Sequence, residues 1–228
     1  MGAHLRILSA NLYRGRADPE AFAEIVRNFG ADVVVVQELG PSQAEALADV
    51  LPYGRLEPDE AYSGMGIAAR WPAATTRVPR VERNARVARL EPCDWPELPR
   101  GVEIVNVHIT APHAYPFWLQ PFRRRTQLEA VLSHVAGNPE LPRAVVGDFN
   151  ATPLWPVYRR FAVHLEDVVQ SYAQARGERP GRTWPRVLGG PLIRIDHCFA
   201  SGLSAEHVET LEIPGSDHLA LGVDLSID

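Results

Sequence analysis

The chain has 228 residues, of which 23 are basic, all of them arginine, and 28 are acidic, so the formal net charge is −5. Apolar residues make up 46% and charged residues 22% of the chain, which is typical of a globular protein and excludes a disordered one. The negative charge excludes a protein that coats nucleic acid through a bulk positive field, but it does not exclude a local basic cleft. The two cysteines, Cys93 and Cys198, exclude a disulfide framework, and no spacing of cysteines and histidines indicates a zinc site.

The predicted elements follow from turn residues and apolar patterning. Asp18 is a typical N-cap for a helix that has Pro19 in its first turn and ends at Gly30. The four valines at 33–36 indicate a strand buried on both faces. The proline-rich residues 91–100 predict a long surface loop. In chain order we expect a strand at 5–12, helix 19–29, strand 33–36, helix 41–51, strands 64–69, 75–78, 86–90 and 102–108, helix 122–135, strand 144–147, a short helix 158–161, and strands 193–200, 207–211 and 219–225.

Strands outnumber helices, and helices separate only some of them, which predicts an α/β (α+β) fold of mixed sheets covered by helices. No linker divides the chain, so we expect residues 1–228 to form a single domain. The longest apolar run, 33–36, is too short to span a bilayer, and residues 1–11 indicate a strand rather than a signal peptide. We therefore expect a soluble, cytoplasmic monomer, although a soluble piece of an exported or anchored protein would have the same pattern.

Polar side chains follow the ends of the predicted strands or stand in the turns beside them. Each alone is typical of a turn former, a helix cap or a buried structural histidine. Their repetition at strand after strand favours a shared site, because functional residues gather where strand ends and loops converge. These residues are Asn11, Gln37 and Glu38, His108, Asp148 and Asn150, Asp196, and the turn Ser216-Asp217-His218.

These residue types suit the hydrolysis of phosphate esters. A phosphodiester is an anion that repels a nucleophilic water until a hard divalent cation neutralises it, and such cations prefer carboxylate and amide oxygens. Glu38 and Asn11 fit the role of metal ligands. Asp148 fits the acceptor that aligns or deprotonates the water, and Asn150 can hold that water or a phosphate oxygen.

Two histidines complete this hypothesis. Charge grows on the phosphoryl oxygens in the transition state, and an imidazolium stabilises it. His218 and His108 fit this role. A histidine that stays protonated near neutral pH usually has a carboxylate partner, and Asp196 could be that partner for His218.

The motifs that carry these residues occur in one order along nearly the whole chain. They are Ser9-Ala10-Asn11, Val36-Gln37-Glu38, Asn106-Val107-His108, Gly147-Asp148-Phe149-Asn150, Arg194-Ile195-Asp196-His197 and Gly215-Ser216-Asp217-His218. In these motifs the sequence resembles the endonuclease/exonuclease/phosphatase superfamily, which includes deoxyribonuclease I. The resemblance implies a four-layer αββα sandwich of two packed mixed sheets flanked by helices. It also implies a Mg²⁺- or Mn²⁺-dependent hydrolase with its site at one end of the sandwich.

The resemblance implies a role for each matching residue. Glu38 would be the main metal ligand with Asn11 beside it, and Asp217 would lie near the metal, directly or through water. Whether one metal or two operate stays open. The remaining roles agree with the chemistry above. Asp148 would orient or deprotonate the attacking water, with Asn150 assisting. His218 would contact the scissile phosphate while Asp196 holds the histidine, and His108 would make a second contact with the phosphate.

One departure bears on the substrate. Abasic-site endonucleases have an acidic residue two positions after the first Asn, where this chain has Tyr13, which weakens a DNA-repair interpretation. Residues 11–18, 147–153, 183–185 and 214–218 look more like a bacterial branch that includes the membrane-anchored protein associated with teicoplanin resistance. That protein is thought to act on a lipid-linked pyrophosphate, but its membrane helices have no counterpart in these 228 residues.

Four further residues are candidates for substrate binding. Arg14 and Arg16 follow Asn11 directly and could bind phosphate. Trp118 lies in an apolar loop, 115–119, which is either a hydrophobic plug on the next helix or a wall that stacks on a base or touches a lipid chain. Thr183 either packs at the sandwich edge or turns its hydroxyl toward the site.

Three functions compete for this pattern. The first is a metal-dependent phosphoester hydrolase, either a phosphodiesterase or nuclease, or a phosphatase that acts on a lipid-linked or small-molecule (pyro)phosphate. The acidic charge does not favour nucleic acid as the partner. The second is a catalytically inactive phosphate-binding module, which the joint presence of all the motifs disfavours. The third is a zinc hydrolase using His108, Asp148 and His218, disfavoured because no histidine pair has ligand spacing.

Overall fold

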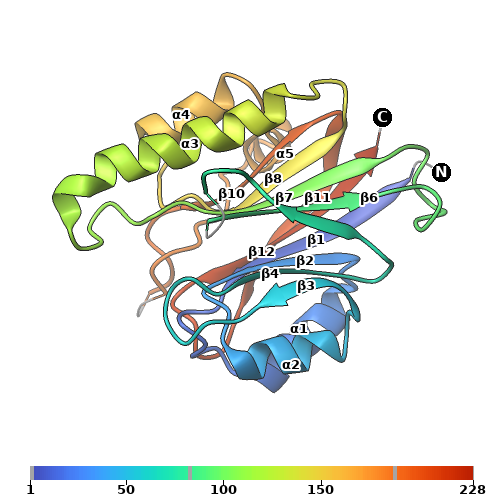
Figure 1. Ribbon diagram of the computed structural model, residues 1–228, viewed down its shortest axis with the longest axis horizontal. Helices are drawn as coiled ribbons and strands as arrows, with labels where there is room; N and C mark the ends of the chain where they lie inside the picture. The colour runs from blue at the N-terminus through green and yellow to red at the C-terminus, as the bar shows by residue number, and fades with distance from the viewer. Residues whose placement is uncertain (1–2, 82–83, 187–188, 228) are drawn as a thin grey trace.

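A computed structural model describes residues 3–81, 84–186 and 189–227 of the chain. Within these residues the strands form two six-stranded mixed sheets packed face to face (Figure 1). The first sheet has the order β11-β12-β1-β2-β4-β3 and consists of β1 (His4–Asn11), β2 (Val33–Gln37), β3 (Tyr53–Glu57), β4 (Met65–Ala69), β11 (Leu203–Glu212) and β12 (Leu219–Ile227). The second has the order β5-β6-β7-β8-β10-β9 and consists of β5 (Ala74–Arg77), β6 (Ala85–Leu90), β7 (Val102–His108), β8 (Arg143–Asp148), β9 (Glu166–Asp167) and β10 (Asp196–Ser201).

Helices cover the outer face of each sheet. In Figure 1, α1 (Pro19–Phe29) and α2 (Pro41–Ala48) lie below the first sheet, while α3 (Gln120–Ala136) and α4 (Pro156–Ala162) lie above the second. A short 3₁₀ helix, η1 (Phe117–Leu119), precedes α3, and α5 (Val168–Ala175) packs against β10 and β11. The four-layer αββα sandwich implied by the sequence motifs is confirmed. No helix in residues 3–81, 84–186 and 189–227 is long and apolar enough to cross a membrane.

Alternating side chains of the strands build three apolar layers. In β2, Val33 and Val35 point into the core between the sheets, while Val34 and Val36 point toward α1 and α2. Because all four valines are fully buried, the run is continuous rather than alternating, as the sequence predicted. On the far side, α3 and α4 bury apolar side chains such as Val131 against the second sheet.

Several boundaries differ from the predicted ones. The first helix begins and ends as predicted, since Asp18 caps it and Gly30 ends it in the left-handed region at φ 68°. The predicted surface loop 91–100 does lie outside the strands, but its Trp95 is 1% exposed and packs in the core between the sheets, so the loop is not wholly at the surface. The strand β10 begins at Asp196 rather than at 193, because Ile193 pairs with Trp184 instead. The strands β3 and β9 and the helix α5 were not predicted.

Strand direction and register bring the motif residues to one end of the sandwich. The parallel pairs β1/β2 and β7/β8 place Asn11 opposite Gln37 and His108 opposite Asp148. The antiparallel strand β10 starts at this end, where Asp196 faces Asp148. β12 also starts here, directly after His218, and runs antiparallel to β1. Residues far apart in the chain thus converge because of the topology.

A buried polar bridge joins the two sheets just beneath this end. The Gln37 side chain donates to Asn106 Oδ1 (2.7 Å), and Asn106 Nδ2 donates to the carbonyl oxygens of Val36 (2.9 Å) and Gly66 (2.8 Å). Both side chains are fully buried. Loss of such hydrogen bonds costs free energy of folding, because the buried donors and acceptors that lose their partners cannot bind water instead.

We predict that Asn106→Ala destabilises the protein by about 3 kcal/mol, since it leaves a buried amide and two carbonyl oxygens without partners. The check is the urea midpoint, with Asn138→Ala at an exposed position as the matched control. A midpoint equal to that of the control would show that the bridge contributes nothing.

Candidate active site

A single amide joins carboxylates from the two sheets. Asn11 Nδ2 lies 3.4 Å from Glu38 Oε1 and 3.1 Å from Asp148 Oδ2. Asn11 ends β1 and Glu38 follows β2 in the first sheet, whereas Asp148 ends β8 in the second. The Asn11 side-chain oxygen accepts from the Tyr13 N–H (3.0 Å), so its NH₂ group faces the carboxylates. The predicted convergence of Glu38 and Asp148 is therefore present in the structure.

The turn at Glu38 is unusual in its backbone. Glu38 has φ 52°, a left-handed conformation that costs free energy in a residue with a side chain. The Arg14 N–H donates to Glu38 Oε2 (3.0 Å), so both carboxylate oxygens are held from the segment that follows β1. The strained turn aims the carboxylate across the end of the sheet rather than into solvent.

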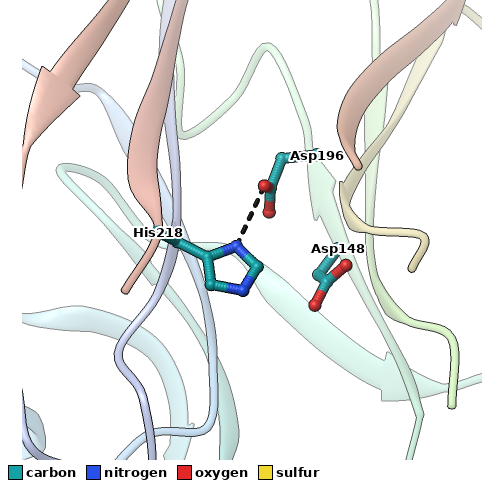
Figure 2. Close-up of side chains that lie close together, drawn as sticks. All are labelled: Asp148, Asp196 and His218. Carbon is teal, nitrogen blue, oxygen red and sulfur yellow. Dashed lines mark hydrogen bonds and ion pairs between the residues drawn. The ribbon is translucent and has the colours of Figure 1, made fainter. Parts of the chain in front are cut away.

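A second contact between the sheets is the pair of His218 and Asp196. His218 Nδ1 lies 3.0 Å from Asp196 Oδ2, and both side chains are buried (Figure 2). Ser216 Oγ accepts from the His218 N–H (3.0 Å) and donates to the Asn11 carbonyl oxygen (2.7 Å). This turn ties the histidine to the end of β1. Its other ring nitrogen is left to face Asp148, as Figure 2 shows.

Asp148 is held by the loop that follows it. Its two oxygens accept from the Asn150 backbone N–H (2.7 Å) and from Asn150 Nδ2 (2.9 Å). Asn150 is also left-handed, at φ 47°. The buried guanidinium of Arg124 donates to the carbonyl oxygens of Asn150 (3.1 Å) and Thr110 and so fixes the loop from α3. Asp148, Asp196 and His218 each offer an atom within 4.8 Å of the others.

Burial and neighbouring charge set the protonation of these groups. Burial alone would lower the pKa of His218, but the charge and hydrogen bond of Asp196 outweigh it and raise the pKa to about 9. Burial and the charge of Asp196 raise the pKa of Asp148, and burial raises the pKa of Glu38. The site therefore combines an imidazolium with a carboxylate that can accept a proton near neutral pH.

His108 lies beside both carboxylates but differs in charge from His218. Its Nε2 is 3.8 Å from Glu38 Oε1 and 3.7 Å from Asp148 Oδ2. Burial and the positive charge of His218 lower its pKa to about 4. Burial and a neighbouring cation thus favour a neutral His108 ring, which can still donate or accept a hydrogen bond. The predicted contact of His108 with phosphate stays a prediction.

A family model described as "Endonuclease/Exonuclease/phosphatase family" matches residues 8–218. The chain belongs to this family. Its members are phosphoester hydrolases, and membership supports a phosphoesterase activity here. No match was found among the curated proteins.

Solved structures show the same fold at low identity. A functionally unknown conserved protein from Enterococcus faecalis V583 has 16% identity and a TM-score of 0.74, over 98% of this chain and 100% of that one. The human Nocturnin catalytic domain with bound sulfate has 20% identity and a TM-score of 0.71, over 100% and 96%. D. rerio TDP2 complexed with a single-strand DNA product has 16% identity and a TM-score of 0.71, over 98% and 99%. At these identities the likeness shows the fold alone.

Asp217, which the family resemblance places near a metal, lies on the turn beside His218. Its Oδ2 accepts from the Trp184 indole N–H (3.0 Å), whereas its Oδ1 is buried and has no hydrogen-bond partner among the described residues. The charge of Asp217 also acts to raise the pKa of Glu38. A buried carboxylate oxygen without a partner beside a second carboxylate fits a divalent cation.

The four predicted substrate-binding residues occupy different surroundings. Arg14 and Arg16 are exposed, with their guanidinium groups over the rings of Tyr62 (3.8 Å) and Tyr13 (4.8 Å). Thr183 is fully buried, and its hydroxyl accepts from the backbone N–H groups of Ile195 and Asp196, so it holds the start of β10. Trp118 is 55% exposed and is not a buried plug. Contact of these four with substrate stays a prediction.

Trp184 and Arg124 support the site but were not among the predicted site residues, and Gln37 was noted at a strand end without a role. Trp184 was part of a motif similar to a bacterial branch, and Gln37 stood beside Glu38, so position in the motifs was a usable signal for both. Arg124 is the middle of three consecutive arginines. Which of the three faces inward depends on the phase of α3, which the sequence alone does not give.

We predict that His218 of the metal-free protein titrates near pH 9. Because this pKa is above the ordinary value of 6.5, the ion pair with Asp196 stabilises the fold fully below that value, and the contribution is lost as pH rises toward 9. NMR titration of the histidine ring protons measures it. Asp196→Asn should lower this pKa, since the charge of Asp196 then no longer opposes burial, although the charges of Asp148 and Asp217 still do. A wild-type His218 that titrates at or below 6.5 would contradict the ion pair.

Proposed function

We propose that the protein is a divalent-metal-dependent hydrolase of phosphate esters that works with Mg²⁺ or Mn²⁺. The observation that carries the proposal is the Asn11 amide, which holds Glu38 and Asp148 within 3.4 Å and 3.1 Å. Acidic groups gathered in this way, beside the pair His218 and Asp196, supply both a cation site and a means of activating water.

Glu38 and Asp217 are the proposed metal ligands. Asp217 is part of the turn of His218, and its charge acts on Glu38. Its buried oxygen, which has no hydrogen-bond partner among the residues that the structure describes, supports this choice. The Asn11 amide, predicted beside the metal, would also keep the carboxylates in place, because its NH₂ group donates to both of them. When bound, a Mg²⁺ or Mn²⁺ ion neutralises phosphate charge and polarises the phosphorus centre.

The protein's own residues would divide the remaining work. Asp148 would orient the attacking water and accept its proton, as its raised pKa favours, with Asn150 assisting. His218, kept protonated by Asp196, would contact the phosphate oxygens where negative charge grows. The neutral ring of His108 would give a second hydrogen bond at the same phosphate.

The substrate class is open between phosphodiesters and phosphate monoesters or pyrophosphates. The structural neighbour D. rerio TDP2 was solved with a single-strand DNA product, which favours testing nucleic acid. The net charge of −5 does not favour long duplex DNA. A panel of plasmid, single strands, RNA, cyclic nucleotides, inositol phosphates and polyprenyl pyrophosphates separates these classes.

We predict hydrolysis of bis-p-nitrophenyl phosphate in Mg²⁺ or Mn²⁺ and none in EDTA. Asp148→Asn should lower turnover by ~10² or more, because it removes the proton acceptor. Asp49→Asn, at an exposed position, is the matched control and should keep full turnover. Equal rates for wild type, Asp148→Asn and the EDTA sample would instead indicate a module that binds phosphate without hydrolysing it.

Glu38 and His218 should separate metal binding from turnover. Glu38→Ala should weaken Mn²⁺ binding measured by calorimetry, since it removes a ligand. His218→Ala should leave Mn²⁺ binding intact and lower turnover by ~10² or more. His164→Ala, at an exposed position, is the control for histidine loss. Full activity in His218→Ala would contradict its assigned role.

A further inference from the structure

An apolar surface projects at the rim of the site. It consists of Tyr115, Phe117, Trp118, Leu119 and Phe122, together with Leu154 and Trp155, and we call it the rim patch. Exposed fractions reach 81% at Tyr115, 71% at Phe122 and 75% at Leu154. A protein surface seldom exposes so many large apolar groups together unless they bind something.

The rim patch lies on the two loops that follow site residues and on η1 and the first turn of α3. The first loop starts after His108, and its Ile109 carbonyl oxygen accepts from Asn150 Nδ2 (3.0 Å). The second starts after Asn150. The Arg124 guanidinium joins them, since it donates to the Thr110 and Asn150 carbonyl oxygens and lies 5.8 Å from the Trp155 ring. In Figure 1 the start of α3 and the loop before it extend beyond the sheets.

The aromatic side chains are held outward rather than folded onto the protein. Trp118 packs edge-on against Tyr115 (centroids 5.5 Å apart) and Phe117 (5.2 Å). The buried Gln120 amide donates to the carbonyl oxygens of Ala114 (2.9 Å) and Pro116 (3.2 Å), which closes the loop beneath them. Because the loop is fixed, the exposed rings do not have to be ordered again when a partner binds.

The charge around the rim patch has the opposite sign to that of the whole chain. Residues 109–128 and 149–165 contain no Asp or Glu, although the formal net charge is −5. The exposed cations beside the patch include Arg123, Arg125 and Arg159, of which Arg125 pairs with Glu129 (2.7 Å) one turn further along α3. Exposed aromatic and aliphatic groups flanked by an excess of arginine match an anionic lipid surface, where rings lie at the headgroup level and arginines pair with phosphate.

We propose that the rim patch docks the protein on an anionic membrane surface. Docking there turns the site toward the lipid headgroups, so an amphiphilic phosphate ester anchored in the membrane is the substrate class; this last step rests on the proposed function. The rim patch and the arginines beside it bind the membrane, and the proposed catalytic residues are not among them.

Vesicle sedimentation tests the docking. Wild-type protein should sediment with sucrose-loaded vesicles of phosphatidylglycerol and phosphatidylcholine in equal amounts, and less with phosphatidylcholine alone. The triple variant Phe117→Ser/Phe122→Ser/Leu154→Ser should bind the anionic vesicles at least about tenfold more weakly, because it removes exposed apolar area. These side chains are outside the core, so the fold is kept. Tyr53→Ser/Val163→Ser removes exposed apolar groups elsewhere and should bind like wild type.

The outcomes separate docking from catalysis. All variants should hydrolyse soluble bis-p-nitrophenyl phosphate alike; vesicle binding without that turnover would reject the proposed function and leave the docking standing. Absence of vesicle binding, or equal binding by wild type and the triple variant, overturns the docking. Binding of a single-stranded oligonucleotide that the triple variant loses, with no vesicle binding, overturns it in favour of base stacking on the rim patch.

Discussion

The hydrogen bond from the Asn11 amide to Asp148 joins the two sheets at the end of the sandwich where the motif residues converge. The apolar layers pack the sheets together without fixing which polar groups face each other. Polar pairs fix this: Gln37 with Asn106 below the site, and Asn11 with Asp148 and His218 with Asp196 within it. A buried polar group without a partner is costly, so a shift of one sheet against the other is penalised at each pair. The contacts that build the proposed active site therefore also hold the sandwich in register.

The same burial creates the electrostatics that catalysis requires. Glu38, Asp148 and Asp196 are acidic groups withdrawn from water at short range, which raises the pKa of Glu38 and Asp148. Only His218 offsets part of this charge among the site histidines, because His108 is kept neutral by burial and by His218 itself. Strain at Glu38 and Asn150, both left-handed, is maintained by surrounding hydrogen bonds. A divalent cation would relieve an excess of buried negative charge, including the Asp217 oxygen that has no hydrogen-bond partner within the described part of the chain.

Local signals in the sequence predicted those parts that depend on local chemistry. The caps of α1 and the valines of β2 follow from residue type, and the motif residues at strand ends converge because parallel strands finish at the same edge. The rest depended on tertiary contacts. The helix α5 has a short apolar sequence that does not distinguish helix from strand, and β3 is an exposed edge strand without alternation. The lowered pKa of His108 and the inward orientation of the Arg124 side chain depend on which groups the fold buries, and no motif encodes this. Likewise, only the fold shows that the apolar loop 115–119 is exposed rather than a buried plug.

The central claim is that carboxylates from separate parts of the chain serve one cation at the end of the sandwich. Anomalous difference density from crystals soaked in Mn²⁺ tests it most directly, since it locates the ion without reference to activity. The account predicts one strong peak at the carboxylates of Glu38 and Asp217, on the side that faces Asp148. A peak elsewhere, or no peak at this site at saturating Mn²⁺, would contradict it.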